Sequence, residues 1–435
     1  MVWQTSLLNS MAGQTQKFGS FTTNINDIID DDTMATASAT SLATSESIKA
    51  YVDANSGGEY DATVGTGGDY ADVQAAITGV GGTDIRLLFV SGVTEDSNIA
   101  VGGLNLLINL SNFTLTMGAN QFTYASAADV TIRGNGIGSG AEIDWTHTSA
   151  GTQLFENASF TTSTTTISGI VLDNNSSTND TYVSTAIEFI DNVELQLPNQ
   201  VRSGILGQGT GNTYSNIRVI GGGASSSQAF QCVSGVVTNL YVAGTFDTGI
   251  GIRIGSNSTA SGIVTNHITN PMELSIDTGA TVSNVLNMSA QALLVTLVNG
   301  SGANLSNMNL GSGGLDIQGF DNGRFSNIIG TGTLDLTDAG AVNNCFTNCR
   351  FTSAFTLAGD RNKFTNCDFI GGGSVSSGAD DNGFVNCQFG ADAGGGSLTL
   401  TINSGSNRTR ASNCLSDVVI SDSGTDSALA NNTVY

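Results

Sequence analysis

The stretch CFTNCRFTSAFTLAGDRNKFTNCDF, residues 345–369, contains one six-residue motif twice, as FTNCRF at 346–351 and FTNCDF at 364–369. The motif is an apolar residue, Ser, Thr or another small residue, Asn, an apolar residue, a variable residue and usually a further apolar residue. Outward from this stretch the pattern recurs as YSNIRV at 214–219, VTNLYV at 237–242, VTNHIT at 264–269, VSNVLN at 282–287, LSNMNL at 305–310, FSNIIG at 325–330, FVNCQF at 384–389 and ASNCLS at 411–416. An earlier relative, ISGIVL at 167–172, has Gly169 in the place of the Asn.

The asparagines of this motif recur every 18 to 27 residues, with a mean spacing of about 22. A period of that length, with strand-like alternation inside each unit, indicates one turn of a solenoid. Each unit is interpreted as strand, corner, strand, with the Asn at the corner. Asn suits a corner because it tolerates left-handed backbone angles. Stacked at roughly 4.8 Å, such asparagines can also hydrogen-bond along the solenoid axis.

A second corner precedes the motif in the C-terminal half of the chain. It is marked by clusters of Asp, Asn, Gly and Arg before an inward Phe or Ala, as DNGRF at 321–325, DRNKF at 360–364, DNGF at 381–384 and NRTRA at 407–411. Such clusters are typical of turns. We therefore expect Asp321, Asp360 and Asp381 to form turns rather than a site.

Composition narrows the classes of partner. The 435 residues include 56 Gly but only 13 Lys and Arg against 37 Asp and Glu, for a net charge of −24. Nucleic acid and anionic lipid are therefore not expected as partners, since both need Lys and Arg patches. No apolar run reaches the roughly 18 residues of a membrane-spanning helix, and the N-terminus lacks the pattern of a secretory signal, so neither membrane insertion nor export is expected.

The repeats resemble those of pectate-lyase-like proteins and phage tailspikes. The resemblance extends to residues 62–99, where such proteins have a Gly-rich strand, a short capping helix (here Tyr70–Thr78) and a further strand (here Ile85–Val90). It implies an all-β fold, a single-stranded right-handed parallel β-helix of about 22 residues per coil, preceded by a short helical stalk and an N-terminal attachment peptide.

The segment SLATSESIKAYVD at 41–53 resembles stalk segments of phage tail fibres, which are typically homotrimers. With this resemblance the expected domains are a virion-attachment N-terminus at 1–33, a stalk or trimerisation helix at 34–58, a first strand and capping helix at 59–84, and the parallel β-helix at 85–435.

Carboxylates are the candidate catalytic residues, because β-helix enzymes cleave polysaccharides with them. Glycoside hydrolysis needs two carboxyl groups roughly 5–9 Å apart. The best cluster is Glu142 and Asp144, which would share one strand face, with Glu156 about one short coil later and Trp145 as a sugar platform. The alternative interpretation is a solvated strand face or turn, and no catalytic set is assigned.

Other chemistry-bearing residues receive structural interpretations. Glu188, Asp191 and Glu194 form a second candidate group of catalytic carboxylates, in an irregular insertion, with a structural role as the alternative. Arg350 and Asp368 would form a surface pair on adjacent coils. His267 occupies an inward position, and His147 is less constrained. Four cysteines directly follow a corner Asn, where other coils have Ile, Leu, Val or Met, which indicates a buried apolar stack. No metal or cofactor is expected, because CFTNC at 345–349 lacks a second pair with metal spacing.

Three hypotheses follow. The first is a virion structural protein, a trimeric tail fibre or spike that attaches to other tail or capsid proteins through its N-terminus and recognises host surface polysaccharide with its β-helix. It would assemble in the host cytoplasm and be released by lysis. The second is a tailspike depolymerase, a glycosidase or lyase, which the end of the chain at NNTVY disfavours because no C-terminal trimerisation domain follows. The third, a secreted pectin-lyase-like enzyme or adhesin, is disfavoured by the missing export signal.

Overall fold

The computed structural model describes residues 27–29, 41–43, 59–124, 126–146, 153–156, 163–174, 181–184, 187–197, 203–207, 210–222, 228–246, 249–268, 270–390 and 399–434. The chain divides into two units, Met1–Asp61 and Ala62–Tyr435. In the first unit, β1 (Asp27–Ile29) pairs in parallel with β2 (Ser41–Ala43). Of the predicted stalk segment at 34–58 only residues 41–43 are described, as β2, and His147 lies outside the described residues.

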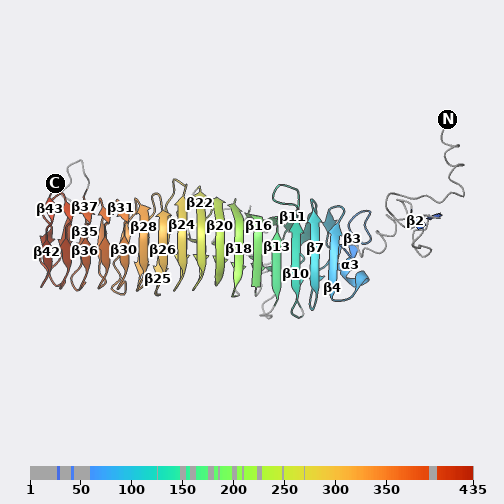
Figure 1. Cartoon of the computed structure of the whole chain (residues 1–435), viewed down its shortest axis with the longest axis horizontal. Helices are drawn as coiled ribbons and strands as arrows, with labels where there is room; N and C mark the ends of the chain where they lie inside the picture. The colour runs from blue at the N-terminus through green and yellow to red at the C-terminus, as the bar shows by residue number, and fades with distance from the viewer. Residues whose placement is uncertain are drawn as a thin grey trace, which may run out of the picture. The chain divides into compact units, whose positions relative to one another are not determined.

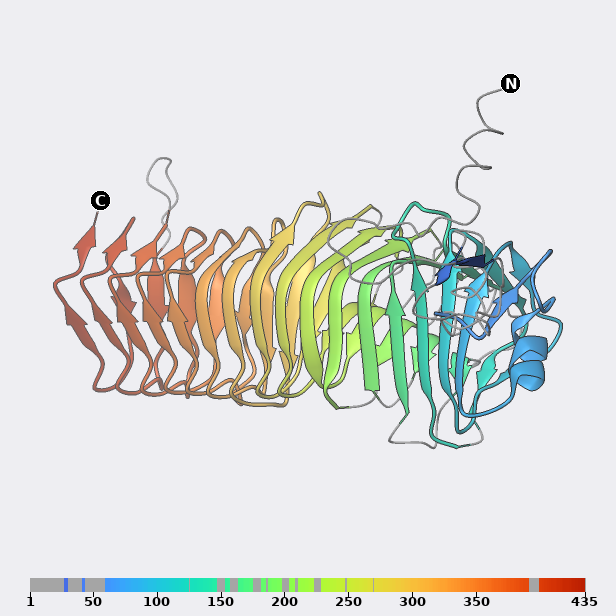
Figure 2. The same cartoon turned by 45° about the vertical axis from the view of Figure 1, so that its right-hand side comes forward.

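The second unit is a parallel β-solenoid with about 23 residues per turn, which confirms the predicted all-β parallel β-helix and its period. Figure 1 shows the strands of successive turns side by side along this unit, and Figure 2 shows the turns stacked in register. Within the described residues the one helix is α3 (Val73–Val80), and no helix there is long and apolar enough to cross a membrane.

Two parallel sheets of 26 and 15 strands wrap the core in the described part of this unit. The larger sheet bends at the Asn corner into two columns. The column before the corner contains β3 (Ala62–Val64), β4 (Asp84–Phe89), β7 (Asn105–Ser111), β10 (Asp129–Gly134), β13 (Thr164–Ser168), β16 (Ile187–Leu197), β18 (Asn212–Gly221), β20 (Gly235–Gly244), β22 (Thr259–His267), β24 (Thr281–Asn287), β26 (Asn304–Asn309), β28 (Arg324–Gly330), β30 (Cys345–Thr347), β33 (Lys363–Thr365), β36 (Gly383–Val385), β39 (Arg410–Ser412) and β42 (Ala428–Ala430). In this column the longer strands continue through the corner into the second column, namely β16, β18, β20, β22, β24, β26 and β28.

The remaining strands complete each turn. The second column is completed by β5 (Val93–Thr94), β8 (Thr114–Gly118), β11 (Glu142–Trp145), β14 (Val171–Asn174), β31 (Arg350–Phe351), β34 (Asp368–Phe369), β37 (Gln388–Phe389), β40 (Leu415–Ser416) and β43 (Thr433–Val434). The smaller sheet contains β6 (Ile99–Ala100), β9 (Phe122–Thr123), β12 (Gln153–Glu156), β15 (Thr181–Ser184), β17 (Ser203–Gly207), β19 (Gln228–Cys232), β21 (Gly249–Ile254), β23 (Met272–Ile276), β25 (Leu293–Val298), β27 (Leu315–Gln318), β29 (Leu334–Leu336), β32 (Phe355–Leu357), β35 (Gly373–Val375), β38 (Leu400–Ile402) and β41 (Ser421–Asp422).

The corner asparagines adopt the left-handed conformation that the motif predicts. Nine of the ten have φ between 53° and 56°, namely Asn216, Asn239, Asn284, Asn307, Asn327, Asn348, Asn366, Asn386 and Asn413. Their side chains form ladders along the axis. From Asn284 through Asn386, the side-chain amide of each corner Asn donates to the side-chain Oδ1 of the preceding corner Asn, at distances of 3.0 to 3.3 Å.

One predicted corner is wrong. Asn266 pairs with Ala243, four residues beyond the true corner, which is Gly262 at φ 71°. The backbone there needs a left-handed residue that approaches the neighbouring turn closely: a Cβ at Gly262 would lie 2.9 Å from Oδ1 of Asn239. Glycine therefore replaces Asn, and VTNHIT matches the motif only in its letters.

The N-terminal end of the solenoid carries α3, as Figure 1 shows. The sequence predicts this helix over 70–78, but it begins at Val73, because Asp72 caps it by accepting a hydrogen bond from the Ala75 amide at 2.6 Å. The helix buries Val73 and Ile77 against the first turns. The following strand, predicted over 85–90, is β4.

The core is built from ladders of equivalent side chains. In the C-terminal turns Phe325, Phe346, Phe364 and Phe384 stack with ring centroids 4.7 to 4.8 Å apart. The position after the corner Asn is buried in successive turns, as predicted, and holds Ile217, Leu240, Val285, Met308, Ile328, Cys349, Cys367, Cys387 and Cys414. Because every turn buries the same places, the outward rows of each sheet are the surfaces that remain for function.

Candidate functional site

Glu142 and Asp144 share the outward face of β11, as predicted, while Ile143 between them is buried. The structure adds a third carboxylate that sequence reasoning missed, since Asp173 of β14 pairs with Asp144 in the next turn. Partial burial, followed by the charges of Asp173 and Asp144, raises the pKa of Glu142. This group, Glu142, Asp144 and Asp173, is termed the acidic cluster.

The other members of the predicted catalytic group are elsewhere. Trp145 is fully buried and its indole Nε1 donates to the Asn120 carbonyl at 3.0 Å, so it offers no platform to a sugar. Glu156 ends β12, which belongs to the smaller sheet and pairs with β9 and β15. The expectation that Glu156 lies one short coil after Glu142 is wrong. Glu156 lies in the same turn as Glu142, the turn that begins with β10 and β11, but on the smaller sheet.

Glu188, Asp191 and Glu194 are in a regular strand, β16, and the predicted irregular insertion is wrong. Glu188 points into the core, where the Tyr214 hydroxyl donates to its carboxylate. Asp191 accepts from the Asn216 amide at 2.9 Å, and Glu194 pairs with Arg218. All three carboxylates therefore have structural partners. The predicted surface pair of Arg350 and Asp368 is present at 3.2 Å.

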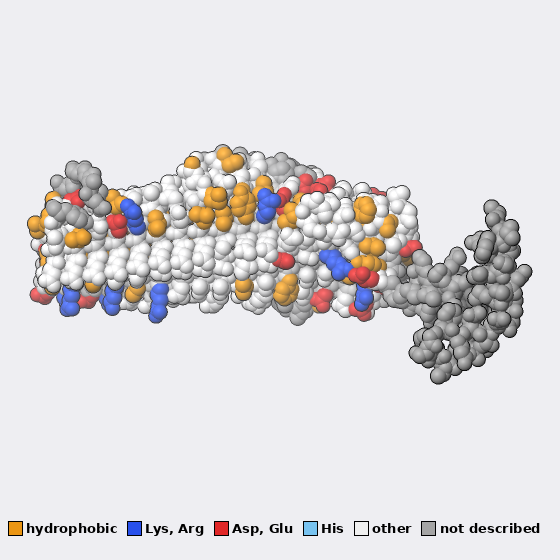
Figure 3. Space-filling model, turned by 45° about the horizontal axis from the view of Figure 1, so that its top comes forward, with side chains coloured by type: hydrophobic (Ala, Val, Ile, Leu, Met, Phe, Trp, Pro, Cys, Tyr) orange, Lys and Arg blue, Asp and Glu red, His pale blue; other side chains and the backbone are white. Residues whose placement is uncertain are grey.

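An apolar row follows on the outward face of the second column. Tyr241, Val264, Leu286 and Ile329 occupy the same register in successive turns, with Asn309 between the last two. Leu286 is 41% exposed and Ile329 is 50% exposed. At the other end of the row, the guanidinium of Arg218 lies 5.7 Å from the ring centroid of Tyr241. Figure 3 shows hydrophobic side chains grouped along the middle of this part of the solenoid.

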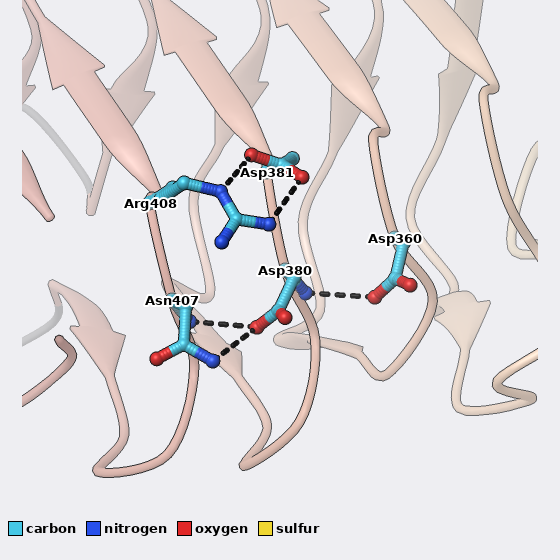
Figure 4. A network of polar contacts seen from close by, with 5 residues as sticks. All are labelled: Asp360, Asp380, Asp381, Asn407 and Arg408. Carbon is cyan, nitrogen blue, oxygen red and sulfur yellow. Dashed lines mark hydrogen bonds and ion pairs between the residues drawn. The ribbon is translucent and has the colours of Figure 1, made fainter. Parts of the chain in front are cut away.

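The second corner forms a network of polar contacts in the C-terminal turns (Figure 4). Asp360 accepts from the Asp380 amide at 2.7 Å, and Asp380 accepts from the amide of Asn407 at 2.8 Å. Arg408 binds Asp381 with two hydrogen bonds of 2.6 and 2.7 Å. Asp360 and Asp381 are turn residues, as predicted, but Asp380 rather than Asp381 is the equivalent of Asp360.

The left-handed position of this corner holds Asn322, Asn343, Arg361, Asp381, Arg408 and Asp426 in successive turns. Behind it, buried asparagines make a second ladder that sequence reasoning missed. The backbone amide of Asn344 donates to the side-chain Oδ1 of Asn362 at 2.9 Å, and the backbone amide of Asn362 donates to the side-chain Oδ1 of Asn382 at 2.8 Å. The sequence does contain a signal for this ladder, because an Asn directly follows the left-handed turn residue in NN at 343–344, RN at 361–362 and DN at 381–382.

An open hollow of about 500 Å³ lies on the outer side of this corner. We term it the corner hollow. Its lining residues are Asn322, Asn343, Cys345, Arg361, Lys363 and Asp381. Arg324, Cys345 and Lys363 are register neighbours on adjacent strands, so the row that borders the hollow is basic.

The five buried thiols and the imidazole of His267 are structural. All six cysteines are free, and five are buried, while Cys345 is exposed. Hydrogen bonding with the Cys367 thiol and burial raise the pKa of Cys349, which keeps that thiol protonated. His267 is buried as predicted, its Nε2 lies 3.1 Å from the Ala292 carbonyl, and burial lowers its pKa. Within the described residues no group of His, Cys, Asp and Glu could hold a metal ion.

Comparison of the chain with models of known families, with curated proteins and with solved structures finds no match.

Proposed function

We propose that the chain is the subunit of a trimeric virion fibre or spike, which attaches to tail or capsid proteins through its N-terminus and binds host surface polysaccharide along its β-helix. The observation that carries the proposal is the pair of outward surfaces, the apolar row and the corner hollow, on one regular solenoid. The tail-fibre resemblance of residues 41–53 supports the virion role.

The apolar row supports association with copies of the same chain. Large apolar side chains on a strand face are unfavourable while they contact water. Burial against an identical row would stabilise the assembly by about 25 cal/mol per Å² of apolar surface removed from water. Ile268 and Met288, 66% and 61% exposed, widen the surface just beyond the row. In a homotrimer the row of each subunit would face the three-fold axis.

The polar turns of the C-terminal half support glycan binding. A sugar needs amide and charged groups that can bind hydroxyl oxygens, and those groups must be free of partners within the protein. The side chains of Asn322 and Asn343 line the corner hollow without a hydrogen-bond partner among the described residues. The repeat would present further groups at the spacing of one turn, which suits a long polymer.

The test combines mass with binding. Light scattering of the full chain is expected to give three times the chain mass of 44.4 kDa. A glycan array probed with the same preparation is expected to show binding to bacterial surface polysaccharides. A monomer that binds no glycan would overturn the proposal.

A polysaccharide depolymerase is the second candidate, and the acidic cluster favours it. A general acid of a glycosidase needs a raised pKa and a second carboxylate nearby, and Glu142, whose pKa is raised by partial burial and by the charges of Asp173 and Asp144, has both. Glu142→Gln would then abolish release of reducing ends from capsule polysaccharide, while Glu273→Gln, a control on the smaller sheet, would leave it unchanged. If the wild-type chain releases no reducing ends and no unsaturated products, this candidate is excluded.

A further inference from the structure

The corner hollow is lined by two cations, Arg361 and Lys363, in a chain that is strongly negative. Of the 13 Lys and Arg, Arg324, Arg361, Lys363, Arg408 and Arg410 lie on the outer side of the second corner and on the row beside it. Figure 3 shows Lys and Arg side chains in succession along one edge of the C-terminal half. The same corner also holds Asp321, Asp360, Asp380, Asp381 and Asp426, so an anion would be attracted to those cations that no acid binds.

Three acids of this corner, Asp360, Asp380 and Asp381, are already engaged. Asp381 is bound by both arms of Arg408, and that hydrogen bonding, with the charges of Arg408 and Arg361, lowers the pKa of Asp381. Asp360 and Asp380 accept backbone amides of the next turn. By contrast, the side chains of Arg361 and Lys363 make no hydrogen bond or close ion pair within the described residues.

The backbone of Arg361 is held in a costly conformation. Its φ of 56° is left-handed, at a position where two neighbouring turns use Asn322 and Asn343. An L-residue other than Gly, Asn or Asp in this region costs roughly 1–2 kcal/mol. Arg408, at φ 55°, repays the same cost with its two bonds to Asp381. Arg361 has no such pair of hydrogen bonds, and it lines the corner hollow.

We infer that the corner hollow binds a carboxylate-bearing sugar of an acidic polysaccharide, with Arg361 and Lys363 on the carboxylate and the amides of Asn322 and Asn343 on the hydroxyls. A guanidinium matches a carboxylate with two parallel hydrogen bonds, and a nearby ammonium adds a point charge. The volume of about 500 Å³ is sufficient for one or two sugar rings. The inference rests on the proposed glycan-binding function and names its ligand class.

Titration calorimetry of the full chain tests this site with three probes. The probes are a polyuronate hexasaccharide, the same hexasaccharide with its carboxyls reduced to alcohols, and a sulfated dextran oligosaccharide. The polyuronate is expected to bind, more weakly as salt rises, because exposed charges are screened. The reduced hexasaccharide is expected to bind at least about tenfold more weakly, since a charge-assisted bond is lost. Equal binding of the reduced or the sulfated probe would overturn the carboxylate assignment.

A double variant locates the binding. Arg361→Asn with Lys363→Gln removes both charges and places Asn where the two preceding turns already have it, so the left-handed corner is kept. We expect a loss of affinity of at least about tenfold for the polyuronate. The matched control is Arg253→Gln, which removes an exposed Arg on the smaller sheet, and it is expected to bind as the wild type does.

The outcomes separate this inference from the proposed function. Polyuronate binding that the double variant retains would overturn the site. Wild-type binding on the glycan array to neutral glycans alone would overturn the ligand class, while the glycan-binding function would stand. If no glycan binds at all, both the inference and the glycan-binding role fail.

Discussion

The side-chain amide of Asn239 donates to the side-chain oxygen of Asn216 at 3.0 Å, one complete turn earlier in the chain. The same contact repeats from Asn284 to Asn386, so the corner that turns each coil also joins it to its neighbour. Each Asn thus supplies a left-handed backbone and a link along the axis, two roles that substitutions can separate.

Asn348→Ala is expected to lower the free energy of unfolding by about 2–3 kcal/mol, since two ladder bonds are lost and alanine is strained at φ 54°. Asn348→Gly loses the same bonds but tolerates the backbone, so its loss should be smaller. Urea unfolding of both variants checks this. Equal losses would mean that the backbone angle contributes nothing.

Phe364→Ala is expected to cost about 3–5 kcal/mol, because Phe364 stacks between Phe346 and Phe384 and the cavity cannot be filled by its neighbours. Phe189→Ala serves as the control, since Phe189 is 43% exposed on β16 and should cost under about 1 kcal/mol. Denaturant midpoints of the two variants measure the contrast. Similar midpoints would contradict the role of the ladder.

Leu286→Glu combined with Ile329→Glu is expected to convert the proposed trimer into a monomer, because carboxylates would replace apolar side chains at the centre and at one end of the apolar row. Val236→Glu is the matched control, since Val236 is 44% exposed on β20 but lies before the Asn corner. Light scattering distinguishes the variants. A trimeric double variant would show that association uses another surface.

Glu95 is expected to make the solenoid less stable as pH rises from about 5 to about 8. Burial raises its pKa to about 7, although the Val73 and Gln74 amides at the start of α3 donate to it. Between the ordinary value of 4.5 and about 7 the folded state binds more protons than the unfolded state, so stability falls with pH over this range.

Glu95→Gln removes that titration and keeps a neutral acceptor for the Val73 amide. The variant is expected to lack this part of the pH dependence and to exceed the wild type at pH 8, by about 3 kcal/mol at most. Thermal unfolding of both proteins at pH 5 and pH 8 measures the difference. An unchanged difference between the two pH values would contradict the buried, protonated carboxyl.

Much of the fold could be predicted because its determinants are local and repeated. The inward position after each corner was found from Ile217 and Leu240 as readily as from Cys349, since burial requires an apolar side chain there in every turn. The prediction that Gly169 takes the place of a corner Asn is confirmed by its φ of 65°, whereas the prediction of a corner at Asn266 is wrong. Gly262 supplies the same backbone angle as Asn, and only the strand register located it.

The candidate sites were harder to predict because turn lengths vary. Asp173 lies beside Asp144 only because β11 and β14 pair in a particular register across a connection of variable length. Neighbouring residues of a strand point to opposite faces, so an error of one residue in the expected register places a side chain on the wrong side of the sheet. Glu188 and Trp145 are therefore buried in the core rather than exposed. Asp380 and Asp381 are likewise adjacent but differ in role: Asp380 accepts the Asn407 amide, whereas Asp381 binds Arg408 and lines the corner hollow.

By itself, the sequence determined the parallel β-helix, its period, its Asn corners and its apolar interior, because a repeat imposes the same local geometry and burial on every turn. Only the tertiary structure decided which outward side chains meet. The apolar row, the acidic cluster and the corner hollow each collect residues about 20 or more positions apart, and the register of stacked strands, rather than any local pattern, brings them together.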